Sequence, residues 1–156
     1  MLDGAARIDD VVAAAVADSQ PAVALTDHGV LYGAVDFYRK ASDAGITPVL
    51  GIEAYLTPGS RFDRPPRRED TRYHITLLAV SQEGYQNLIQ LSSKAYLEGF
   101  YYKPRMDREI LSEHAAGLVA TTGCLGGHVP QLLAPDASDE EGNVSGQRDF
   151  DAAVEA

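Results

Sequence analysis

The fold is decided by AVALTDHGVLYGAVDFYRKASDAGITPVLGIEAYL (22–56), in which two apolar segments flank an amphipathic one. The segments 22–28 and 47–56 are short, apolar and bounded by Pro or Gly, which is typical of buried strands. The segment between them has helical periodicity, and Gly45 ends it. Its apolar residues are Ala34, Phe37, Tyr38 and Ala41. This order predicts a parallel strand pair joined by a crossover helix.

The same alternation of helices and strands continues on both sides of this unit. Helical spacing precedes it over residues 8–16, and further strands are predicted at 73–80 and 117–123. Residues 57–72 hold five arginines and three prolines, which predicts an exposed, mobile loop. Additional helices are expected over 85–96 and near 107–116. The predicted fold class is therefore α/β, with a parallel sheet or barrel.

Composition places the chain among ordinary globular domains. Its 156 residues suffice for one domain, and 45% of them are hydrophobic. A net charge of −10 argues against a general nucleic-acid binder, because neutralising phosphates requires Lys and Arg. The single cysteine, Cys124, excludes a disulfide framework and is compatible with the cytoplasm. No apolar run reaches the roughly 20 residues of a membrane helix, so no membrane association is expected.

Two stretches, 60–72 and 101–108, are locally basic. The pattern favours solvated loops over nucleic-acid contact. If these stretches do touch nucleic acid, the contacting residues are expected to be Arg61, Arg64, Lys103 and Arg105.

Four residues with metal-binding side chains lie on or beside successive predicted strands. His28 ends the first strand, Glu53 lies on the second opposite its apolar face, and Cys124 follows the fourth. His74 instead lies at the beginning of its strand. Functional groups of α/β folds gather where strands end, so a common site is one interpretation. Imidazole, carboxylate and thiolate suit Zn²⁺ or a similar transition metal.

The pattern alone leaves a second interpretation open. His28 would then be a capping or packing histidine, Glu53 a partnered carboxylate and Cys124 a small buried hydrophobe. Asp3 by itself is typical of a turn or a helix cap. No spacing has the specificity of a paired CxxC zinc site, and the sequence contains no GxSxG, GxxxxGK[ST] or GxGxxG motif.

Six segments closely resemble the alpha subunits of bacterial DNA polymerase III. They are LDGAARIDD (2–10), AVALTDHGVLYGAVDFYRKA (22–41), GITPVLGIEAYLTPGSR (45–61), YHITLLA (73–79), EGYQNLIQLSSKAYLEGFYYKPRMD (83–107) and HAAGLVATTGCLGG (114–127). Together they cover most of positions 2–133. The phrases YYKPRMD and TDHGVLYGA are more specific than the general pattern of the PHP (polymerase and histidinol phosphatase) superfamily.

The resemblance implies a PHP domain, a distorted seven-stranded TIM-like β/α barrel that holds up to three metal ions with nine residues. The ligands carried over to this sequence are Asp3, His28, Glu53, His74 and Cys124, with Zn²⁺ or Mn²⁺ as the metal. In some members the domain is a 3′→5′ proofreading exonuclease, and in others it is a structural platform. The parent protein would be a cytoplasmic DNA-directed DNA polymerase that uses Mg²⁺ and deoxynucleotides. Its partners would be DNA, an exonuclease subunit and the sliding clamp.

The sequence departs from this family pattern at both ends, which predicts a barrel incomplete at both ends. A His-x-His motif is expected before LDG, an Asp-x-His motif is expected beyond residue 156, and Val30 replaces a usual Asn. The expected organisation is a truncated PHP domain over 1–133, an acidic loop over 134–146 and the start of the next helix over 147–156. The polymerase aspartates belong to another domain, so the chain alone is expected to lack polymerase activity and most nuclease activity.

Three functions fit the sequence. The first is part of a replicative polymerase, the second a free-standing metal-dependent phosphoesterase similar to histidinol phosphatase, and the third a purely structural module. A free-standing enzyme would close its own barrel with both terminal motifs, which favours the polymerase. The sequence does not distinguish the first function from the third.

Overall fold

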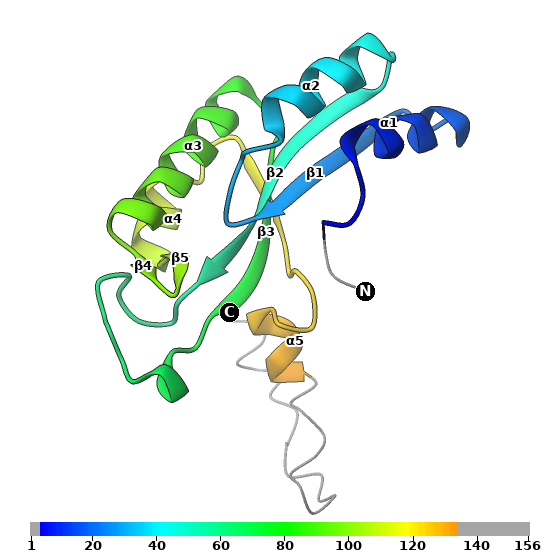
Figure 1. Ribbon diagram of the computed structural model, residues 1–156. Helices are drawn as coiled ribbons and strands as arrows, with labels where there is room; N and C mark the ends of the chain where they lie inside the picture. Colours follow the sequence, from blue (N-terminus) through cyan, green and yellow to red (C-terminus); the bar gives the residue numbers. More distant parts are fainter. Residues whose placement is uncertain (1–3, 134–156) are drawn as a thin grey trace, which may run out of the picture.

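The computed structural model describes residues 4–133, and it is built from one mixed sheet with helices packed against it (Figure 1). The strands are β1 (Ala22–His28), β2 (Thr47–Leu56), β3 (Tyr73–Ala79), β4 (Phe100–Tyr101), β5 (Lys103–Met106) and β6 (Leu118–Thr121). The helices are α1 (Ile8–Ala17), α2 (Ala34–Asp43), α3 (Gln82–Leu97), α4 (Arg108–Glu113) and α5 (His128–Leu133), with a 3-10 turn, η1, at Arg67–Glu69. The strand order is β4-β5-β2-β3-β6, and β1 also pairs with β2.

The strand pair at the centre of the sheet forms as the sequence predicts. β1 and β2 are parallel, in a register that runs from Ala22 opposite Thr47 to His28 opposite Glu53. Helix α2 is the crossover between them, since parallel neighbours cannot be joined by a tight turn. This register brings the ends of two predicted site strands to the same level.

The third strand corrects the expectation of a parallel sheet. β3 is antiparallel to β2, and β6 is antiparallel to β3. Residues 57–72, which connect β2 to β3, contain only the short turn η1 and no crossover helix, so the chain returns beside β2 in the opposite direction. The α/β class is confirmed, but the sheet is mixed and open, and no closed barrel forms within residues 4–133.

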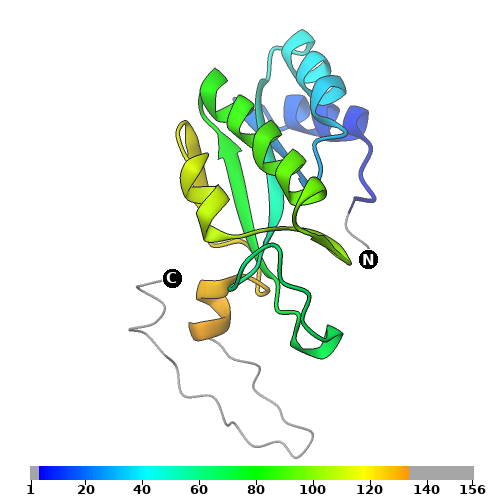
Figure 2. The ribbon, with the colours of Figure 1, turned by 90° about the vertical axis from the view of Figure 1, so that its left-hand side faces the viewer.

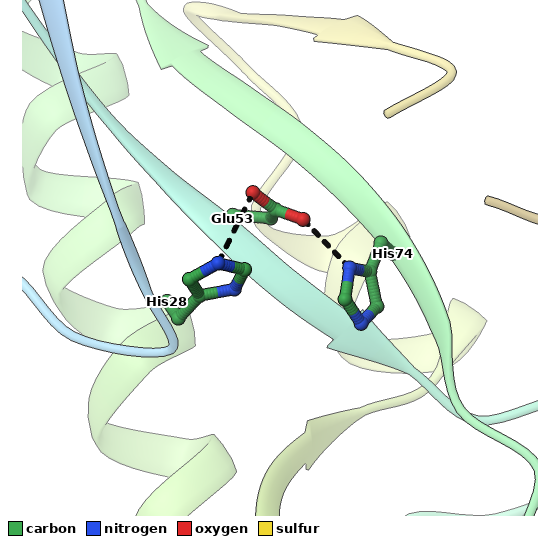
Figure 3. A group of neighbouring side chains, drawn as sticks. All are labelled: His28, Glu53 and His74. Atoms are coloured by element: carbon green, nitrogen blue, oxygen red, sulfur yellow. Dashed lines mark hydrogen bonds and ion pairs between the residues drawn. The ribbon is translucent and has the colours of Figure 1, made fainter. Parts of the chain in front are cut away.

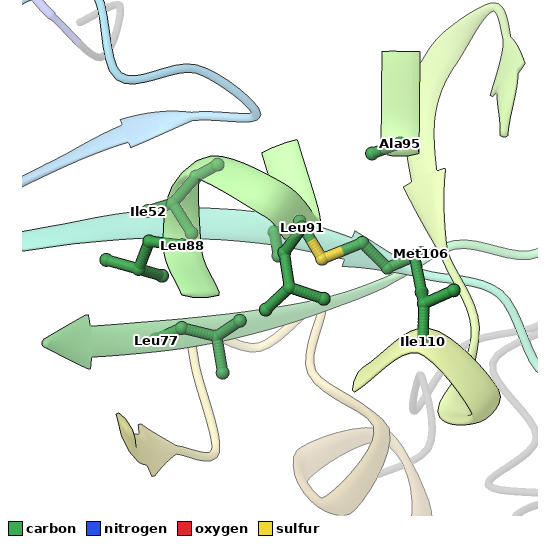
Figure 4. Packing of buried hydrophobic residues seen from close by; sticks show 8 residues of the cluster. Ile52, Leu77, Leu88, Leu91, Ala95, Met106 and Ile110 are labelled. Carbon is green, nitrogen blue, oxygen red and sulfur yellow. The ribbon is translucent and has the colours of Figure 1, made fainter. Parts of the chain in front are cut away.

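Helices α1, α2 and α3 cover one face of the sheet (Figure 2). Two apolar clusters fill the space between the helices and the strands. The larger one joins β2, β3, α3, β5 and α4 (Figure 4), and the smaller one joins α1 and α2 to β1 and β2. The buried members of the larger cluster are Ile52, Ala54, Leu77, Leu88, Leu91, Ala95, Met106 and Ile110. Because side chains alternate along a strand, Glu53 lies on the opposite face of β2 from Ile52 and Ala54.

The connection 57–72 is better anchored than its composition predicts. Arg61 is only 7% exposed, and its guanidinium group bonds to Glu98, Asp107 and Glu109. Arg105, on β5, is fully buried. It donates to Asp70 and to the backbone carbonyls of Gly99, Arg61 and Asp63. The expectation of a wholly mobile loop is therefore corrected.

These contacts also correct part of the expected nucleic-acid surface. The guanidinium groups of Arg61 and Arg105 are buried against protein acceptors, so neither is presented to a ligand at the surface. Arg64 and Lys103 are exposed. Their contact with nucleic acid stays a prediction.

The hairpin of β4 and β5 is an element that the sequence patterns did not predict. The basic stretch 101–108 was expected to be a solvated loop, but Phe100 pairs with Pro104 and Tyr101 with Lys103. The turn is closed by Tyr102, whose φ of 58° is rare for a residue other than glycine. β5 then extends the sheet by pairing with the end of β2.

Some predictions fall outside the described residues. Asp3, the acidic loop over 134–146 and the helix start over 147–156 all belong to this group. Among residues 4–133, the structure has no helix of the length and apolarity needed to cross a bilayer.

Candidate metal centre

The face of the sheet opposite the helices carries the predicted site. His28 and Glu53 are register partners in the parallel pair, and His74 is opposite Tyr55 in the antiparallel pair. Residues 53 and 55 share one face of β2, so all these side chains project to the same side. His74 lies at the beginning of β3, but β3 runs antiparallel, and its beginning therefore lies beside the end of β2. Strand direction thus accounts for the position of His74, which had no structural explanation in the sequence.

Glu53 lies between the two imidazoles (Figure 3). One carboxylate oxygen, Oε1, is 2.6 Å from His74 Nδ1, and the other, Oε2, is 3.7 Å from His28 Nε2. One ligand atom from each of the three residues can be chosen so that all lie within 4.8 Å of one another. The three side chains are 18–34% exposed, so they are accessible from solvent although most of their surface is packed against protein.

The turn after β6 brings Cys124 to the same cluster. Its Sγ is 3.4 Å from His74 Nδ1 and also accepts a hydrogen bond from the Gly126 amide at 3.3 Å. The His74 amide donates to the Gly126 carbonyl, which ties the turn to the beginning of β3. Gly123 has a φ of 74°, and a Cβ there would lie 2.8 Å from the His74 carbonyl oxygen. The close approach of the turn to β3 therefore requires glycine at this position.

All four described candidates line one cavity of about 760 Å³, together with Asp27 and Tyr32. Gly4, the first described residue, lines it as well. Asp3 lies outside the described residues, and its assignment as a ligand stays a prediction. The four candidates come from β1, β2, β3 and the turn after β6, which are far apart in the sequence.

Two aromatic residues of this region were missed in the sequence. The ring of Tyr55 stacks on His28 with a centroid distance of 6.2 Å and meets His74 edge-on at 5.3 Å. Tyr55 follows Glu53 by two positions, so strand alternation alone contained the signal that would have found it. Tyr32 lies in the loop after β1, where no periodicity indicates the direction of a side chain.

The donor set fits a divalent transition metal. Two imidazoles and a carboxylate are ligands of Zn²⁺ and Mn²⁺, and the neighbouring thiol favours Zn²⁺, since Mn²⁺ prefers oxygen ligands. The hydrogen bond between Glu53 and His74 also holds both side chains in position, which reduces the reorganisation that ion binding would require. The cluster therefore offers ligand atoms that could hold a metal ion and leave one side accessible.

The family model for the PHP domain matches residues 1–155. The DNA polymerase III alpha subunit of Thermus aquaticus is 51% identical over 143 residues, covering 89% of this chain and 12% of the relative. The corresponding subunit of Deinococcus radiodurans is 47% identical over 148 residues, covering 90% and 11%. That of Borreliella burgdorferi is 43% identical over 146 residues, covering 92% and 13%. The chain thus spans about 12% of the length of the first of these relatives.

Among solved structures, an amidohydrolase from Chromobacterium violaceum with bound sulfate and no metal matches 60% of this chain and 29% of its own length. Its identity is 24% and its TM-score is 0.42, which is too low to establish a common fold. The match of the family model over nearly the whole sequence is decisive: the chain belongs to the PHP domain family.

Proposed function

We propose that this chain is the PHP domain of a bacterial DNA polymerase III alpha subunit and that its cluster binds Zn²⁺ or Mn²⁺. The observation that carries the metal assignment is the close grouping of His28, Glu53 and His74 with Cys124 beside them. Identities of 43–51% to polymerase subunits support the parent assignment. The parent would copy DNA from deoxynucleotides with Mg²⁺ in the cytoplasm, together with an exonuclease subunit and the sliding clamp.

The proposed centre would act on a phosphodiester at the 3′ end of a DNA strand. A bound divalent ion would supply Lewis-acid chemistry to the phosphate. Glu53 would hold the two imidazoles in position through its two oxygens, and the thiol of Cys124 would add a soft ligand on the His74 side. Asp3 is proposed as a further ligand. We also propose that this site carries out proofreading and that the ion is not only structural.

Metal binding is tested on the purified 156-residue chain after treatment with EDTA. Titration with Zn²⁺ and Mn²⁺ by calorimetry should show saturable binding, and elemental analysis should recover the ion after desalting. His74→Ala should weaken binding by at least about 10-fold, because it removes a ligand that contacts both Glu53 and Cys124. The matched control is His114→Ala, since His114 contacts Asn87 instead.

Binding of equal strength in wild type and His74→Ala would contradict the proposed centre. The exonuclease part is tested separately on the full-length polymerase subunit with a labelled single-stranded substrate. Glu53→Gln should abolish 3′→5′ degradation while DNA synthesis continues. Degradation that survives in this variant would leave only the structural role for the ion.

A further inference from the structure

We infer that a basic-aromatic surface, formed by Tyr32, Arg67, Tyr96, Phe100, Tyr102 and Lys103, binds single-stranded DNA beside the metal centre. The inference rests on the proposed function for the nature of the ligand, since it extends the site from a single phosphate to a strand. It assigns this role to the β4–β5 hairpin, the connection 57–72 and the loop after β1.

Exposed aromatic side chains lie on this surface beside the metal centre, at the end of α3 and on the β4–β5 hairpin. Tyr32 lines the metal-centre cavity, is 86% exposed and lies close to the Tyr96 side chain. Tyr96 stacks on Phe100 with a centroid distance of 5.9 Å and an interplanar angle of 22°. Phe100 begins the hairpin whose turn is Tyr102, which is 53% exposed. Single-stranded bases stack on exposed aromatic side chains of this kind.

The cations of the surface contact these rings and leave their charges available. The Arg67 guanidinium lies 5.4 Å from the centroid of Tyr102, and the Lys103 ammonium lies 5.3 Å from that of Tyr55. Both side chains are exposed, and neither forms a salt bridge with an acidic residue among residues 4–133. A cation held over a ring is positioned for a phosphate with little loss of freedom.

Local charge is opposite in sign to the charge of the whole chain. Residues 57–72 and 100–106 together carry seven basic and three acidic side chains, and five basic ones remain when the buried Arg61 and Arg105 are set aside, whereas the full sequence has a net charge of −10. Positive charge confined to one surface of an acidic protein restricts a polyanion to that surface. The acidic charge of the whole chain and a local nucleic-acid surface are therefore compatible.

The hairpin is fixed directly to the metal centre. Tyr55 contacts both imidazoles, and the Lys103 ammonium also lies over its ring, so one side chain touches both sites. Gly29 follows His28 with a φ of 70°, and a Cβ there would lie 2.8 Å from Pro104 Cγ in the hairpin. The hairpin therefore packs on the residue next to a candidate ligand. A strand lying on Tyr102 and Lys103 would therefore lie beside the cluster.

The experiment measures fluorescence anisotropy of a labelled oligo(dT) of about 12 nucleotides with the purified chain, a length within the range that stacking platforms occupy. It is done in EDTA at low salt, so its result does not depend on metal binding. Tyr102→Ala should weaken binding roughly 10-fold, because a lost stacking partner has an effect of that size. Arg67→Ala and Lys103→Ala should each weaken it and reduce the salt slope by about 0.7, the contribution of one phosphate contact on a single strand.

One matched control lies next to the proposed surface, and the other lies away from it on α2. Arg68→Ala removes an exposed arginine of the same turn that pairs with Glu69, and Tyr38→Ala removes an exposed tyrosine on α2. Both should bind oligo(dT) like wild type, and near-ultraviolet circular dichroism should verify that every variant is folded. Absence of binding by wild type, or equal losses in the controls, would overturn the inference. Oligo(dT) binding together with a failed metal titration would refute the metal centre alone.

Discussion

Asp107 shows how one carboxylate fixes the geometry between the connection 57–72 and α4. Its side chain caps α4 by accepting from the Ile110 amide at 3.1 Å. It also accepts from the Arg61 amide at 2.9 Å and from the Arg61 guanidinium at 3.1 Å. Burial acts to raise the pKa of Asp107, but these hydrogen bonds and the charge of Arg61 outweigh it and lower the pKa. Hydrogen bonds to Glu109, Glu98 and Asp107 together raise the pKa of Arg61 despite its burial.

A lowered pKa in the folded state makes stability depend on pH in a defined direction. The charge of Asp107 stabilises the fold above its unfolded pKa of 3.8, and this contribution is lost as pH falls through the lower folded value. We expect Asp107→Asn, which keeps a capping side chain, to be less stable than wild type at pH 7 by about 2 kcal/mol. The difference should shrink as pH falls below about 4, because wild type then loses the charge as well.

Urea unfolding of wild type and Asp107→Asn at pH 7, 5 and 3 measures this convergence. Glu109→Gln is the control, since Glu109 contacts the same guanidinium but its side chain is 69% exposed. It should cost less stability at every pH. A constant difference between wild type and Asp107→Asn down to pH 3 would contradict the role of the charge.

At the scale of elements, the connection 57–72 divides into an anchored part and an exposed part. Arg61 is buried, whereas the Arg68 side chain is 86% exposed in η1. We expect trypsin to cut first after Arg67 or Arg68 and to spare Arg61, because cleavage requires a locally opened, accessible segment. Mass spectrometry of early fragments identifies the bond, and Asp107→Ala, which removes the acceptor of both the Arg61 amide and its guanidinium, should release Arg61 and add a cut there. Early cleavage at Arg61 in wild type would contradict the anchoring.

Elements with a strong period were predictable from the sequence. The strand 47–56 was predicted with the bounds that the structure has, and α1, α2 and α3 follow their apolar spacing closely. Strand direction was not predictable, since a period of two residues is the same in parallel and antiparallel strands. The hairpin at residues 100–106 was missed because Tyr102 occupies the positive-φ position that glycine usually marks.

The candidate site was predictable in part for the same reasons. Residue type and strand position were enough to group His28, Glu53, His74 and Cys124 as candidates, and the family resemblance favoured their interpretation as ligands, His74 included. Burial of Arg61 and Arg105 was not predictable, because each has an acidic partner more than 30 positions away in the sequence. Glu98 bonds to Arg61, and Asp70 bonds to Arg105. From composition alone, every arginine in a basic stretch is expected to be exposed, whereas the structure buries two of them.

At the scale of the whole molecule, the sheet has one face packed against helices and a second face that holds the polar cluster. The cluster joins β1, β2, β3 and the turn after β6, which are otherwise held by sheet hydrogen bonds. An ion shared by these segments would bind the folded chain and not the unfolded one. The proposed metal binding would therefore be coupled to global stability.

We expect Zn²⁺ at 100 times its dissociation constant to stabilise the chain by about 2.7 kcal/mol. The Tm should then rise by several degrees, because each kcal/mol shifts the Tm of a domain by about 2–8 °C. Differential scanning calorimetry with Zn²⁺ and with EDTA measures the shift. His28→Ala should remove most of it, because it deletes the ligand on β1 and leaves the ion bound to fewer segments. The control His114→Ala should keep the full shift, and an equal rise in His28→Ala would place the ion away from this face of the sheet.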